Sequence, residues 1–185
     1  MSWPIFRVFF RYRAYGKEHL PASGGFVLAA GHVSNIDPWP LGLGVFPQRF
    51  LRFMAKSELF WPPLGWFINA AGAFKVNRGT ADRAAIETAV ELAREGNVIA
   101  MFPEGTRRTK GLRKKYTAQA HTGAARIARD AGVPLVPAGI RGTDRLNRLG
   151  PLRVRYGTPV EVTDDLDETT ERLMAAIREL EHSLA

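Results

Sequence analysis

The stretch GFVLAAGHVSNID (residues 25–37) contains both a structural and a chemical signal. Residues 25–30 are uncharged and mostly apolar, which is typical of a β-strand. His32 and Asp37 follow directly, five positions apart, and Pro38 comes next. Such a pair at the end of a strand is either a proton carrier held by an acid or a local hydrogen bond that closes the strand.

Similar apolar runs recur along the chain and alternate with helical patterns. Besides 25–30, they predict strands over 50–55, 73–76, 97–102, 134–140 and 152–157. Apolar residues at helical spacing predict helices over 81–95, 118–131 and 167–184. We therefore expect a single α/β layered domain over residues 1–185, with a mixed, mostly parallel sheet flanked by helices.

Composition excludes several classes of protein. The chain has no cysteine, so it has no disulfide, no thiolate nucleophile and no cysteine metal site. No run reaches the roughly 18–20 apolar residues of a membrane-spanning helix, and the longest candidate, residues 59–74, contains two prolines. The first residues lack the cleavage site of a secretory signal. These features predict a cytoplasmic protein.

The net charge of +8 is unevenly distributed. Residues 161–185 carry eight acidic and two basic side chains, which leaves a net charge of +14 on residues 1–160. Such an excess favours polyanionic partners: nucleic acid, an anionic membrane, a phosphorylated metabolite or an acidic carrier protein. A basic nucleic-acid-binding module is one alternative, but the sequence signatures of the common DNA- and RNA-binding motifs are missing.

Four motifs stand at the ends of predicted strands, where α/β domains place their chemistry. They are HVSNID (32–37), GAFKVNR (72–78), FPEGTR (102–107) and VPLVPAGIRGT (133–143). The second ends in Arg78, and the third turns through a proline and a glycine to present Glu104 and Arg107. Because an arginine fork matches the geometry of a phosphate, two arginines from separate strand ends predict an anion site. The alternative is that they are ordinary surface charges.

Taken in this order, the four motifs resemble the glycerophospholipid acyltransferase family, typified by 1-acylglycerol-3-phosphate acyltransferase. The resemblance covers about residues 25–145. It implies transfer of a fatty acyl group from acyl-CoA or acyl-carrier protein to the free hydroxyl of 1-acylglycerol 3-phosphate, giving phosphatidate in phospholipid biosynthesis. No metal or other cofactor is expected. Glycerol 3-phosphate, or another lyso-lipid such as lyso-ornithine lipid, is the alternative acceptor.

The resemblance also assigns roles by position. It makes His32 the general base, Asp37 its partner and Arg78 a ligand of the acceptor phosphate. The other positions that it assigns to substrate binding are Glu104, Gly105, Thr106, Arg107 and Pro137, the last beside the acyl chain. The family often has Phe-Lys-x-Gly where this chain has AHTG (120–123), so His121 stands in place of a lysine. With Lys75 it forms a candidate secondary anion site.

The expected chemistry suits these residue types. An imidazole changes charge near neutral pH and can remove a proton from a lipid hydroxyl as the oxygen attacks a thioester. An aspartate would hold its tautomer and stabilise the imidazolium. With no cysteine, and with Ser34 lacking the glycine-flanked elbow of a hydrolase nucleophile, direct transfer is expected.

Two apolar segments have alternative interpretations. Residues 1–17 mix aromatic side chains with arginines, which predicts a membrane-interfacial segment and a peripheral protein at the inner face of the membrane. The alternative is a first helix or strand that packs on the core. The aromatic residues between 60 and 67 are either core or an acyl channel or membrane-facing lip.

Overall fold

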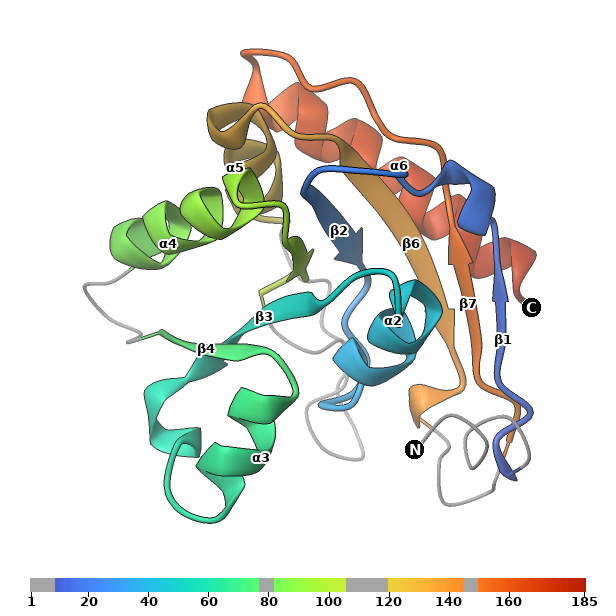
Figure 1. Cartoon of the computed structure of the whole chain (residues 1–185). Helices are drawn as coiled ribbons and strands as arrows, with labels where there is room; N and C mark the ends of the chain where they lie inside the picture. Colours follow the sequence, from blue (N-terminus) through green and yellow to red (C-terminus); the bar gives the residue numbers. More distant parts are fainter. Residues whose placement is uncertain (1–8, 77–81, 106–119, 145–149) are drawn as a thin grey trace.

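The computed structural model describes residues 9–76, 82–105, 120–144 and 150–185 (Figure 1). Its seven strands form one sheet in the order β1-β7-β6-β2-β5-β3-β4. All neighbouring strands are parallel except β6 and β7, which are antiparallel. The expected mixed, mostly parallel α/β sheet is therefore confirmed.

The six predicted strands are present, each within one residue of its expected ends. They are β2 (Phe26–Ala30), β3 (Leu51–Lys56), β4 (Ala73–Val76), β5 (Val98–Met101), β6 (Leu135–Arg141) and β7 (Arg153–Tyr156). Two predicted helices agree equally well, α4 (Asp82–Arg94) and α6 (Leu166–Ser183). The third, α5 (Gly123–Ala131), begins later than expected, and the backbone N–H of His121 bonds to the carbonyl of Pro103 instead of starting a helix.

The core has two layers, one on each face of the sheet. On one face, α2 (Pro38–Val45) packs against alternate residues of the central strands, such as Phe26 and Leu28. On the other face, α4, α5 and α6 cover the intervening residues, such as Val27 and Ala29. Figure 1 shows this division, with α2 on the opposite side of β2 from α5 and α6. Both faces are buried, which is why the central strands are continuous apolar runs.

Four short elements are not among the strands and helices predicted above from the sequence, although a first strand was one alternative for the amino-terminal stretch. They are β1 (Arg13–Tyr15), α3 (Leu64–Ala70) and the 3-10 turns η1 (Lys17–His19) and η2 (Ser57–Leu59). β1 pairs with β7, and Tyr12 just before it is buried in the core. The packing alternative for the amino-terminal stretch therefore holds for residues 10–15, whereas residues 1–8 lie outside the described part.

Helix α2 was also missed by the sequence-based prediction. Its sequence, PWPLGLGV, has two prolines and two glycines in eight residues, so its intrinsic helix propensity is poor. Pro38 is at the first helical position, where its missing N–H costs nothing. Burial of Leu41 and Val45 supplies the stability that propensity does not.

Across the described ranges, every helix is too short or too polar to cross a bilayer.

Candidate active site

His32 and Asp37 meet at the carboxyl end of β2, as expected. The Nδ1 atom of His32 lies 2.9 Å from Oδ2 of Asp37. An ionised carboxylate only accepts hydrogen bonds, so Nδ1 carries the proton and Nε2 has a free lone pair. The His32 side chain is 18% exposed, whereas that of Asp37 is fully buried. The imidazole is thus partly exposed, and the acid is hidden.

Three donors fix the Asp37 carboxylate. Its Oδ2 atom accepts from the backbone N–H of Val33 at 2.7 Å and of Ser34 at 2.8 Å, besides His32. These bonds fold residues 32–37 into a tight loop around the carboxylate, so the acid cannot turn away from the imidazole. Ser34 takes part through its backbone, in agreement with a loop role rather than a nucleophilic one. Oδ1 is buried and has no hydrogen-bond partner among the described residues.

The FPEG turn after β5 lies beside this pair. The ring of Phe102 stacks on the imidazole of His32, with centroids 4.4 Å apart and planes 25° from parallel. Because β5 is the sheet neighbour of β2, the two motifs emerge side by side. Glu104 is buried at 4% exposure. Phe102 is the first residue of the FPEGTR motif, yet its contact with His32 joins residues 70 positions apart and could not be derived from spacing.

His121 packs on the same turn. A Cβ atom placed on Gly105, which has φ +64°, would lie 2.8 Å from the His121 ring. The turn therefore needs a glycine both for its backbone conformation and for the close approach of the imidazole. The structure thus brings the AHTG segment to FPEG.

The remaining predicted site residues have different outcomes. Lys75 is exposed on β4 with its Nζ 5.1 Å from the centre of the Phe60 ring, and no described contact joins it to His121. Pro137 is buried inside β6 opposite Ala29, and its carbonyl accepts from Gly157. It lies in the core below the end of the strand, and its role beside an acyl chain stays a prediction. The other three, Arg78, Thr106 and Arg107, lie outside the described residues.

Comparison with known proteins decides the family. A family model described as Acyltransferase matches residues 11–141. The chain belongs to this acyltransferase family. The match includes all four motifs except the last two residues of the fourth.

Individual relatives agree with this assignment. This acyltransferase is 34% identical to the 1-acyl-sn-glycerol-3-phosphate acyltransferase of Bacillus subtilis, over 93% of this chain and 89% of that protein. It is 29% identical to the Streptococcus pneumoniae protein of the same name, over 75% of this chain and 51% of that protein. The crystal structure of the 1-acyl-sn-glycerophosphate acyltransferase from Thermotoga maritima matches it with a TM-score of 0.67 and 27% identity, over 91% of this chain and 71% of that chain.

Two buried tyrosines of the acyltransferase hold the helix that follows Asp37. The hydroxyl of Tyr12 donates to the carbonyl of Pro40 at 2.7 Å, and the hydroxyl of Tyr156 donates to that of Leu41 at 2.8 Å. Burial raises the pKa of both hydroxyls, and the proximity of Tyr12 raises that of Tyr156 further. Both therefore stay neutral donors. Tyr156 lies in β7, and Tyr12 directly precedes β1. Together they fix α2, and with it the loop 32–37, to these two strands.

We call the two hydrogen bonds from Tyr12 and Tyr156 to α2 the clamp. Gly44 leaves the space that the Tyr156 hydroxyl occupies, so we predict the effect of Gly44→Ala. A Cβ atom on Gly44 would overlap the Tyr156 hydroxyl. Alanine improves helix propensity by about 1 kcal/mol, but overpacking a fully buried ring costs about 1–3 kcal/mol. We expect a lower melting temperature and a loss of kcat, because α2 must shift. The double variant Gly44→Ala/Tyr156→Phe should recover part of the stability in a double-mutant cycle; strict additivity of the two changes would contradict the overlap.

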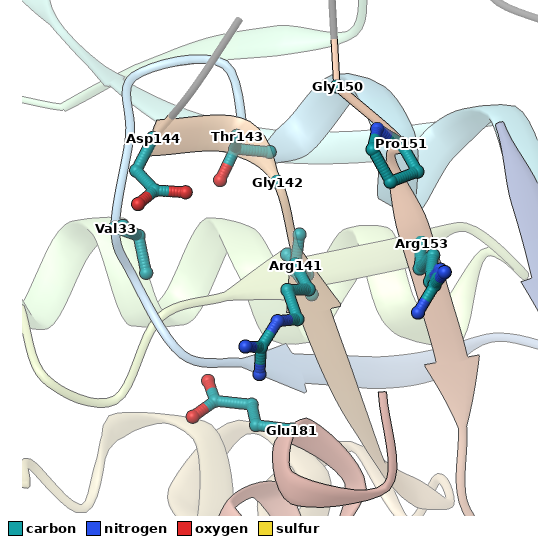
Figure 2. Close-up of a pocket in the computed structure, with 10 residues that line it drawn as sticks. Val33, Arg141, Gly142, Thr143, Asp144, Gly150, Pro151, Arg153 and Glu181 are labelled. Atoms are coloured by element: carbon teal, nitrogen blue, oxygen red, sulfur yellow. The ribbon is translucent and has the colours of Figure 1, made fainter. Parts of the chain in front are cut away.

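A hollow of about 290 Å³ lies where β6 ends and β7 begins, and Val33 is one of the residues that line it (Figure 2). Arg141 and Arg153 line it together with Asp144 and Glu181, and Figure 2 shows Arg141 and Glu181 pointing toward one another. Since two acids balance two arginines among these lining residues, the hollow lacks the excess of positive charge that a phosphate site needs. The described lining residues therefore do not form an anion site.

Proposed function

We propose that this acyltransferase moves a fatty acyl group from acyl-CoA or acyl-carrier protein to the free hydroxyl of 1-acylglycerol 3-phosphate, producing phosphatidate for phospholipid biosynthesis. The observation that carries the proposal is the pair of His32 and Asp37, in which a buried carboxylate holds Nδ1 of a partly exposed imidazole. The names of the Bacillus and Streptococcus relatives support this acceptor.

The chemistry needs one proton carrier. Nε2 of His32 takes the proton of the lipid hydroxyl as its oxygen attacks the thioester carbonyl, and Asp37 stabilises the imidazolium that forms. When the tetrahedral intermediate collapses, the C–S bond breaks, the imidazolium returns the proton to the leaving thiolate, and an ester and a free thiol remain. Phe102 limits rotation of the ring during both transfers, because it stacks on one face of the imidazole.

The test is an acceptor and donor panel with purified protein. Radiolabelled acyl-CoA and acyl-carrier protein are each offered with 1-acylglycerol 3-phosphate, glycerol 3-phosphate, lyso-ornithine lipid and a zwitterionic lyso-lipid. We expect label in phosphatidate above every other product. Faster labelling of another acceptor would show that this acceptor is the substrate instead. No transfer to any acceptor would contradict the proposed activity.

The acceptor phosphate gives a separate prediction. We propose that Arg78 and Arg107 bind it, as the resemblance implies. Truncating either to alanine should raise the KM for the phospholipid acceptor by roughly 10- to 150-fold, since a charge-assisted contact is worth about 1.5–3 kcal/mol. The KM for the acyl donor should change little. Arg172→Ala on α6 is the matched control, because Arg172 pairs with Glu168 on the helix surface. Equal effects on both substrates would show that the arginines hold the fold or the donor.

We also propose that the enzyme works as a peripheral protein at the inner face of an anionic membrane. The net charge of +8 supports this location, since basic proteins are attracted to anionic lipids. A lipid acceptor that resides in the bilayer also requires the enzyme to reach a membrane. Residues 1–8, with Trp3 and Arg7 among them, remain a candidate contact.

A further inference from the structure

Large apolar side chains gather on the outside of the segment between β3 and β4. We define the aromatic surface as the exposed side chains of η2, α3 and the turn between them: Leu59, Trp61, Trp66 and Phe67. Their exposed fractions are 42%, 57%, 73% and 59%. Soluble proteins rarely expose so many large apolar groups within nine residues unless they bind something. Figure 1 shows α3 below β3 and β4, away from the layer of α4, α5 and α6.

The aromatic surface is held rigidly. Gly65 packs so closely that a Cβ atom there would lie 2.6 Å from the carbonyl carbon of Phe60, and its N–H bonds to the carbonyl of Trp61 at 2.7 Å. Phe67 stacks on Trp39 of α2 with ring centroids 5.3 Å apart. Because these contacts fix the backbone, the outward direction of Trp61 and Trp66 is a property of the fold.

The charges around the aromatic surface are complementary to an anionic partner. Lys56 ends β3 three residues before Leu59, and Lys75 lies on β4 eight residues after Phe67; both are exposed. Between these two lysines, Glu58 is the one charged residue in the sequence. Exposed aromatics bordered by lysines match the interface of a bilayer, where tryptophan rings lie among headgroups and lysines meet lipid phosphates.

Its position relative to the catalytic pair also fits a membrane. β2, β5, β3 and β4 are neighbours in this order and run parallel. Lys56 therefore lies at the carboxyl ends of the strands, as His32 does. Trp39, which supports Phe67, is two residues from Asp37. A bilayer that receives the aromatic surface therefore lies next to the site that must receive a lipid.

A second copy of the chain fits less well. At these exposed fractions, the four side chains together offer on the order of 450 Å². A stable protein interface needs about 800 Å² from each partner.

We propose that the aromatic surface inserts into the headgroup region of an anionic bilayer and so delivers the lipid acceptor to His32. This inference rests on the proposed function, because it requires a bilayer-resident substrate.

Vesicle binding and activity test the inference together. Full-length wild type, Trp61→Gln/Trp66→Gln and the matched control Phe50→Gln are floated with phosphatidylglycerol-containing vesicles and with phosphatidylcholine vesicles. Phe50 is 49% exposed and precedes β3 at the opposite end of the strand. We expect the double variant to bind anionic vesicles roughly tenfold or more weakly than wild type, and Phe50→Gln to bind as wild type does. Deletion of residues 2–8 in each background measures any contribution of the amino terminus.

Activity separates this inference from the proposed function. With a short-chain 1-acylglycerol 3-phosphate dissolved as monomers, the double variant should keep the wild-type kcat, while with vesicle-embedded acceptor it should lose activity in proportion to binding. Wild-type inactivity on both acceptors would reject the proposed function. Equal binding of the double variant and Phe50→Gln, or a wild-type dimer that the double variant converts to monomer, would overturn the membrane surface.

If the double variant Trp61→Gln/Trp66→Gln does not fold, quenching of tryptophan fluorescence tests the inference instead. Lipids brominated near the headgroup should quench wild-type tryptophan fluorescence more strongly than that of the Trp66→Phe variant, because they reach Trp66. Equal quenching of the two proteins would overturn the inference.

Discussion

His32→Ala is expected to lower kcat for acyl transfer by roughly 10²- to 10⁴-fold, the usual contribution of a general base. No cysteine is present to supply another route, and Nε2 of His32 is the basic nitrogen that the loop 32–37 presents. The fold should survive, because the lost stacking on Phe102 is worth about 0.5–1.5 kcal/mol. Circular dichroism and a thermal melt check this next to the assay.

His32→Asn provides the control for a purely structural role. Its side-chain amide can donate to Oδ2 of Asp37 in place of Nδ1 but cannot act as a base at neutral pH. Both variants should therefore be inactive, with the asparagine variant the more stable. Recovery of activity above a few per cent of wild type in the asparagine variant would show that His32 only holds the loop.

Asp37→Asn is expected to reduce kcat by roughly 10²- to 10³-fold, because a buried negative charge close to the imidazolium is worth up to about 4 kcal/mol at an effective dielectric of 20. All three donors meet the same oxygen, Oδ2. An asparagine whose carbonyl oxygen takes that position keeps every one of these bonds, so the change removes mainly the charge. Its amide nitrogen then occupies the place of Oδ1, which has no described hydrogen-bond partner, and this lowers stability by about 1–3 kcal/mol.

Asp37→Ala is the comparison that separates charge from geometry. It also removes the acceptor for the amides of Val33 and Ser34, so the loop itself should loosen. The kcat of this variant should fall below that of Asp37→Asn. If Asp37→Asn kept wild-type kcat, the carboxylate would have no role beyond holding the loop.

The central strands β2, β5 and β6 were predictable because burial on both faces makes each one a short, almost entirely apolar run. The pair of His32 and Asp37 was predictable because the loop that joins its members is only six residues long. Helix α2 was not, because its prolines and glycines oppose helix formation and only tertiary contacts maintain it. The clamp of Tyr156 on Leu41 spans 115 positions, and no local pattern signals such a contact.

The resemblance to a family supplied what local patterns could not, namely the roles of separate motifs. The structure supports that grouping where it can be followed: β2 and β5 are neighbours, so HVSNID and FPEG lie together. The stacking of Phe102 and the exposure of Trp66 depend on the three-dimensional arrangement alone.

The pairing of β1 with β7 bears on the order in which the protein is made. Tyr12 and Tyr156 both hold α2, yet one is translated near the start of this sequence and the other close to its end. On the ribosome, β1 has no sheet partner among the described strands until Arg153–Tyr156 has emerged. The chain must therefore wait for a contact of very long sequence separation, which slows folding and leaves apolar surface exposed meanwhile. A nascent chain that stops before β7 would contain His32 and Asp37 but lack half of the clamp, so we expect catalytic competence to arise only after β7 has been translated.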